Sequence, residues 1–194
     1  HARAMTDASL DRQSLQELAE KKQVIEIDEK LSAFERLVGS IENDLVAAGG
    51  RDVPADWRAR TVHGELAFAP VHGIDGTWKL HAALEISMPA VCQRCLNVFE
   101  WPLLADLNIL LCVAGETLDA EQIPTGYELW EVPGETVNLI DVADEALVMA
   151  LPLAATHVDM ADCVELTPSE EEEHDDTNTP FASLRTLMDE ESKN

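Results

Sequence analysis

Four residues of this chain have side chains that bind soft metal ions, and they fall into two groups. Cys92 and Cys95 are separated by two residues, a spacing at which the turn between them points both sulfurs to the same side. His157 and Cys163 follow much later in the chain. Three thiolates and one imidazole can fill the tetrahedron of a structural zinc site. We therefore interpret these four residues as a candidate site for zinc.

Two other interpretations of the cysteines stay open. Free cysteines are often buried as small apolar side chains. A redox-active pair needs a strand before it and a helix after it, because the helix N-terminus lowers the pKa of the thiol. Here an apolar-alternating run follows Cys95 instead, which disfavours redox chemistry. Cys112 lies within that run at a position opposite to the apolar ones, which favours a packing role over metal binding.

The segments around the cysteine pair have the period of two that is typical of strands. Apolar residues alternate over 62–68, over 78–88 and on the odd positions of 99–113. Pro70 and the glycines of 72–76 predict a turn between the first two runs. These two runs then form a hairpin that Pro89 ends, and the cysteine pair occupies the turn of a second hairpin. Shorter strands are expected over 24–27 and 128–132.

Helical periodicity predicts three helices. A short one is expected within 10–22, and a clear amphipathic stripe runs from Leu31 to Leu45, with Asp28 as its expected N-cap. The third runs from Asn138 or Asp141 to Leu151, ahead of Pro152. The predicted fold class is therefore α+β, with antiparallel β-hairpins or a meander packed with amphipathic helices and an acidic disordered C-terminal tail.

Composition divides the chain into four parts. Residues 1–9 are interpreted as a tag remnant or disordered N-terminus, with Met5 the expected native start, and 10–164 as a single α+β domain. Residues 165–179 are expected to be an acidic disordered linker and 180–194 a short helical segment. No apolar run is long enough to cross a bilayer and no leader precedes the domain, so we expect a cytoplasmic protein without membrane contact.

The charge of the chain is strongly negative and unevenly distributed. Lys and Arg number 13 against 38 Asp and Glu, for a formal net charge of −25. No Lys or Arg occurs between Arg94 and Arg185. Because cations supply most of the affinity of proteins for nucleic acid, the C-terminal half should repel RNA. An acidic surface suits a basic protein partner instead, although it could equally serve solubility alone.

Sequence motifs for catalysis are absent. The chain contains no phosphate-binding loop, dinucleotide fingerprint, nucleophile elbow or zinc-protease helix motif. Asp106, on the polar side of its strand, comes closest to a carboxylate suited to acid–base chemistry. The sequence therefore favours a protein that is not an enzyme and has no small-molecule substrate.

An ordered set of segments resembles the YceD family of bacterial large ribosomal RNA subunit accumulation proteins. The set comprises Cys92-Gln93-Arg94-Cys95, Asp144 to Leu153, His157, Cys163, and the terminal Pro180 to Leu187. The resemblance runs from about Val62 to the C-terminus. It implies a non-enzymatic cytoplasmic factor that is needed for the accumulation of 23S rRNA and hence for biogenesis of the large ribosomal subunit.

Three hypotheses follow for the partner. The acidic chain could hold a basic ribosomal protein or assembly factor and release it to 23S rRNA or to a pre-large-subunit particle. The more basic N-terminal half could instead contact rRNA directly through Arg51, Arg58, Arg60 and Arg94. The third hypothesis is a zinc-stabilised acidic interaction module outside ribosome assembly, which would mimic nucleic acid or regulate another protein.

Overall fold

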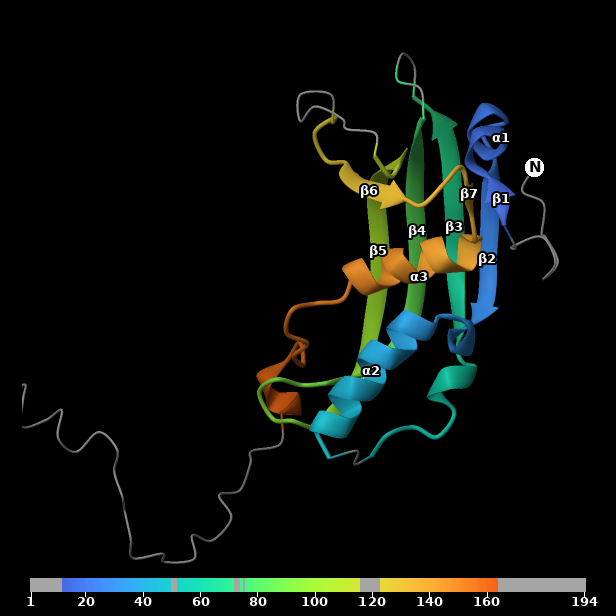
Figure 1. The fold of residues 1–194 in the computed structure, drawn as a ribbon. Helices are drawn as coiled ribbons and strands as arrows, with labels where there is room; N and C mark the ends of the chain where they lie inside the picture. Colours follow the sequence, from blue (N-terminus) through green and yellow to red (C-terminus); the bar gives the residue numbers. More distant parts are fainter. Residues whose placement is uncertain (1–11, 50–51, 72–73, 75, 116–122, 164–194) are drawn as a thin grey trace, which may run out of the picture. The chain divides into compact units, whose positions relative to one another are not determined.

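The computed structural model describes residues 12–49, 52–71, 74, 76–115 and 123–163. Within them, a five-stranded sheet has the order β2-β3-β4-β5-β6, and a separate two-stranded sheet pairs β1 with β7 (Figure 1). The strands are β1 Gln13–Ser14, β2 Val24–Lys30, β3 Thr61–Pro70, β4 Thr77–Val91, β5 Val98–Val113, β6 Glu128–Val132 and β7 Thr136–Val137. The helices are α1 Leu15–Glu20, α2 Glu35–Ala47 and α3 Leu139–Met149, with short 3-10 turns η2 Leu31–Ala33, η3 Trp57–Ala59 and η5 Met160–Asp162. The predicted α+β class is confirmed.

Strands β3 to β5 form the two expected antiparallel hairpins, and β2 pairs antiparallel with β3. Strand β4 continues through Pro89 to Val91, so Pro89 does not end it as predicted. The ring of Pro89 removes one donor from the strand, but β4 still pairs with β5 on both sides of it. Strand β6 runs parallel to β5, a pairing for which the sequence made no prediction. Residues 114–127 separate the two strands in the sequence.

The core lies between one face of the sheet and the helices. Figure 1 shows α2 and α3 crossing the same face of the five-stranded sheet, with α1 near its β2–β3 edge. The alternating apolar residues point to this face, for example Leu66, Leu80 and Ile109, which are almost fully buried. Leu37 and Leu147 face them from α2 and α3. The period-two and period-3.6 patterns of the sequence thus meet in one hydrophobic cluster.

The start of α2 differs from the prediction. Asp28 does not cap this helix, because it lies in β2 and pairs with His63 on β3 at 3.1 Å. The helix begins at Glu35, and its N-cap residue, Phe34, has no side-chain oxygen that could accept a hydrogen bond. Asp144 of α3 caps it from outside: its carboxylate accepts hydrogen bonds from the backbone N–H groups of Arg36 at 2.8 Å and Leu37 at 2.9 Å. This buried carboxylate joins the two helices.

A close approach between β3 and β4 requires glycine at residue 64. Gly64 has φ +146°, and a Cβ built on it would lie 2.1 Å from the backbone oxygen of Ala83. No other residue fits there without movement of the backbone. The glycine therefore sets the register in which the two strands pair, with Gly64 opposite Leu84.

The expected C-terminal linker and helical segment lie outside the described residues, as does the expected tag remnant. No helix among the described residues is long and apolar enough to cross a membrane.

Candidate metal centre

The turn between β4 and β5 positions the first two candidate ligands. It spans Cys92 to Asn97, and two backbone hydrogen bonds close it: Cys92 N–H donates to Asn97 O at 3.0 Å, and Leu96 N–H donates to Cys92 O at 2.8 Å. Cys92 and Cys95 are both buried. The prediction that this pair occupies a hairpin turn is confirmed.

The segment after α3 brings the other two ligands to the same place. It reaches the turn through a hydrogen bond from Gln93 N–H to Ala155 O at 2.9 Å. His157 and Cys163 then lie against the cysteine pair, and η5 between them ends with a bond from Cys163 N–H to Met160 O at 3.1 Å. Arg94 donates from its guanidinium to the backbone oxygen of His157. Residues distant in sequence thus meet at one end of the sheet (Figure 1).

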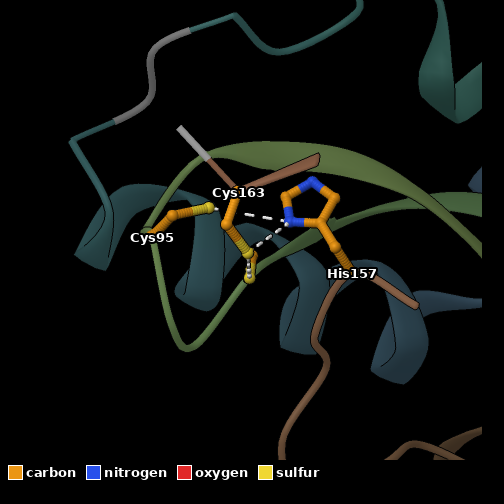
Figure 2. Close-up of side chains that lie close together, drawn as sticks. Cys95, His157 and Cys163 are labelled. Atoms are coloured by element: carbon orange, nitrogen blue, oxygen red, sulfur yellow. Dashed lines mark hydrogen bonds between the residues drawn. The ribbon is translucent and has the colours of Figure 1, made fainter. Parts of the chain in front are cut away.

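The four donor atoms form a compact set, and all lie within 4.8 Å of one another. Cys92 Sγ is 3.9 Å from Cys163 Sγ, and His157 Nδ1 is 3.6 Å from Cys95 Sγ and 3.5 Å from Cys163 Sγ. Figure 2 shows the imidazole of His157 directed at the sulfurs of Cys95 and Cys163.

These separations can be compared with a zinc tetrahedron. With Zn–S of about 2.3 Å and Zn–N of about 2.1 Å, a tetrahedral site has sulfur–sulfur edges of about 3.8 Å and sulfur–nitrogen edges of about 3.6 Å. The three distances given above agree with these edges within a few tenths of an ångström, and the remaining separations are no longer than 4.8 Å. The donor types and their spacing therefore fit zinc, and the four side chains form a candidate zinc site.

The backbone around Cys92 favours its thiolate. Burial raises the pKa of Cys92, but hydrogen bonds from the backbone of His157, Cys95 and Arg94, with one from the Cys95 side chain, outweigh it and hold the pKa at about 5. Burial, together with hydrogen bonds to Cys92 and Cys95, raises the pKa of Cys163 to about 11. Metal binding would therefore release the proton of Cys163, while Cys92 already favours the charged form that a metal requires.

An aromatic ring lies against the imidazole of His157. The ring of Phe99, at the start of β5, lies 4.3 Å from that of His157 between centroids, and Trp101 meets Phe99 edge to face at 5.9 Å. The alternation of apolar residues predicts that Phe99 faces the core and does not predict its contact with His157. The only signal available was its position shortly after Cys95, which does not identify a partner.

Cys112 lies apart from the four. It is buried in β5, and its Sγ is 3.6 Å from the backbone oxygen of Trp130. It is not one of the four cysteine and histidine residues that come together.

Three of the four arginines considered for rRNA contact interact with groups of the protein itself. Arg58 pairs with Glu42 and lies over the ring of Trp57, and Arg60 binds Glu100, with one N–O distance of 2.7 Å. Arg94 donates to His157 as described. Arg51 lies outside the described residues.

Comparison with protein families gives one match. Residues 80–188 match the family model described as "Large ribosomal RNA subunit accumulation protein YceD". The matched region is more than half of the chain and contains all four candidate ligands. No curated protein and no solved structure matches the chain.

Proposed function

Because the chain belongs to the YceD family of large ribosomal RNA subunit accumulation proteins, we propose that it is a non-enzymatic cytoplasmic factor needed for the accumulation of 23S rRNA. The observation that carries this proposal is the family match itself, which extends from β4 through α3 and the candidate zinc site. Loss of such a factor would impair assembly of the large ribosomal subunit.

The role proposed for the zinc site is structural. Four protein donors fill a tetrahedron and leave no open position for substrate or water, which is the arrangement of structural rather than catalytic zinc. A bound zinc ion would cross-link the turn between β4 and β5 to the segment 155–163. The residues of the chain support the same junction through the bonds of Gln93 to Ala155 and of Arg94 to His157.

A basic ribosomal protein or assembly factor is the partner that the charge favours. The chain carries a formal charge of −25, and electrostatic attraction would speed its encounter with a cationic protein. The rRNA phosphates would compete for the same cations, which offers a route for release of the partner onto a pre-large-subunit particle. Direct rRNA contact through Arg51, Arg58, Arg60 and Arg94 is less favoured, because three of these guanidinium groups already bind groups of the protein.

The test of the proposed function is the ratio of 23S to 16S rRNA in cells depleted of this protein. A selective fall of 23S, restored by the intact gene, would support the proposal. An unchanged ratio would overturn it and favour the acidic interaction module outside ribosome assembly. Sedimentation gives an independent distinction, because an assembly factor should migrate with precursors of the large subunit and a mimic of nucleic acid should not.

A further inference from the structure

The turn that carries Cys92 and Cys95 contains a residue in an unfavourable backbone conformation. Leu96 has φ +59°, in the left-handed region where glycine is favoured and a bulky side chain is uncommon. The turn requires this conformation, because it reverses the chain at Leu96 so that Asn97 O can accept the hydrogen bond from Cys92 N–H. Glycine would satisfy the same bond at lower cost in free energy.

Packing does not compensate for this strain. The side chain of Leu96 is 53% exposed, so about half of its surface remains in water. An unfavourable conformation that is kept for an exposed apolar side chain indicates a role outside the fold. Leu96 is directed outward by a turn that two buried cysteines hold in place.

Two further apolar side chains are exposed on the opposing segment. Val158 follows His157 and is 99% exposed, and Met160, whose backbone oxygen accepts the bond from Cys163 N–H, is 73% exposed. Because Cys95 Sγ and His157 Nδ1 are 3.6 Å apart, the chain neighbours Leu96 and Val158 lie at the same end of the molecule. We call Leu96, Val158 and Met160 the knuckle patch.

The charges around the knuckle patch indicate what could cover it. Asp159 and Asp162 are exposed on the same segment. The sequence that follows Cys163 contains seven carboxylates before the next cation, Arg185: Glu165, Glu170, Glu171, Glu172, Glu173, Asp175 and Asp176. RNA would be repelled by these charges, and so would a second copy of a chain of charge −25.

We infer that the knuckle patch is the docking surface for a basic protein whose own apolar surface is bordered by Lys or Arg. This inference rests on the proposed function and names the surface through which it would act. The apolar side chains provide the desolvated contact, and the exposed carboxylates of Asp159 and Asp162 provide attraction at long range. A zinc ion bound by the four ligands would hold the turn that carries Leu96 against the segment that carries Val158 and Met160.

Leu96→Gly separates docking from folding. The substitution removes the apolar side chain and relieves the strained conformation, so the unfolding temperature should stay equal or rise and zinc content should not change. Met160→Ser tests the opposing segment independently. Val46→Ser is the matched control, because Val46 is 77% exposed on α2 and lies outside the patch.

The probe is the protein fraction extracted from purified large ribosomal subunits, compared with 23S rRNA stripped of protein. The zinc-loaded wild-type chain and Val46→Ser should bind the protein fraction equally, whereas Leu96→Gly and Met160→Ser should bind at least tenfold more weakly. Equal binding by all four chains, an equal loss with Val46→Ser, self-association of the wild type, or preference for the rRNA would each overturn the inference.

Failure of this inference can be told apart from failure of the proposed function. In depleted cells, the gene for Leu96→Gly should restore the 23S to 16S ratio less well than the wild-type gene. Restoration to the wild-type ratio would overturn the inferred docking surface without contradicting the proposed function. If depletion does not lower the ratio at all, the proposed function fails, and the binding measurement then decides the docking surface by itself.

Discussion

Cys92 combines two properties that rarely occur together in a cysteine that only packs. Its side chain is fully buried, which by itself favours the neutral thiol, yet backbone hydrogen bonds hold its pKa at about 5. A buried thiolate requires a counter-charge, and a metal ion coordinated by the three other ligands would supply it. Cys112 is equally buried but lies apart from the ligand set, so the two cysteines form a natural comparison.

The residue-scale prediction concerns metal content. Wild-type protein purified without chelator should carry one zinc ion per chain, and Cys92→Ser should lose most of it because a serine hydroxyl is a poor zinc ligand. Cys112→Ala should keep the ion. Elemental analysis of the three proteins measures this directly. Equal zinc in wild type and Cys92→Ser, or none in the wild type after growth with added zinc, would contradict the assignment of these ligands.

The residue types of the candidate site could be predicted from the sequence, but their surroundings could not. The short spacing of Cys92 and Cys95 and the strand patterns on both sides place the pair in a turn. Phe99 could not be assigned to His157, because ring contacts between distant segments leave no local pattern. Leu96 could not be recognised either, since an apolar residue after a cysteine does not by itself reveal a left-handed backbone.

At the scale of elements, the junction of α2 and α3 depends on Asp144. The sequence offered Asp28 as the cap of α2 because local capping usually comes from the residue just before a helix. The chain instead bends through η2, and the cap comes from more than a hundred residues later. Local rules located the helix but could not supply a tertiary cap.

Asp144→Ala should strongly lower the free energy of unfolding. It leaves the N–H groups of Arg36 and Leu37 without their acceptor in a buried junction, and loss of such charge-assisted bonds costs about 2–3 kcal/mol. Urea denaturation followed by circular dichroism measures the change. Asp141→Ala, on the exposed side of the same helix, is the matched control and should change stability far less. A similar loss of stability in both variants would contradict the capping role assigned to Asp144.

The start of β3 is joined to β5 by an ion pair that should respond to pH. Arg60 and the side chain of Ser87 donate to the Glu100 carboxylate, and the Arg60 hydrogen bond is the main cause of the lowered pKa of Glu100. A lowered pKa means that the pair stabilises the folded state above the ordinary pKa of glutamate. That contribution is lost as pH falls through the lowered value.

Glu100→Gln should therefore flatten the acid side of the stability profile. Between about pH 5 and pH 3, the free energy of unfolding should fall less steeply in the variant than in the wild type, by a small amount because Glu100 is half exposed. Arg60→Gln should flatten it in the same way, since it removes the other partner. Urea titrations at several pH values test this, and unchanged slopes in both variants would exclude a contribution from the pair.

At the scale of the whole molecule, the predicted α+β class and the order of β3 to β5 followed from periodicity and from the turn residues between the runs. The parallel pairing of β6 with β5 did not, because a five-residue strand carries no signal of direction. The negative charge of the chain is unevenly distributed along the sequence. Eleven of the 13 Lys and Arg residues lie at or before Arg94. Nearly all charged side chains after Arg94 are therefore negative.

This asymmetry predicts how binding to a basic partner should depend on salt. Attraction between exposed charges is screened over about 8–10 Å at physiological ionic strength, so salt should slow association much more than it speeds dissociation. Binding to the protein fraction of large subunits should therefore weaken severalfold between 0.1 M and 0.5 M salt, mainly through the on-rate. Surface plasmon resonance separates the two rates. A salt-independent on-rate would show that the acidic half does not steer the encounter, and tight binding to protein-free 23S rRNA at low salt would show that the arginines of the N-terminal half outweigh it.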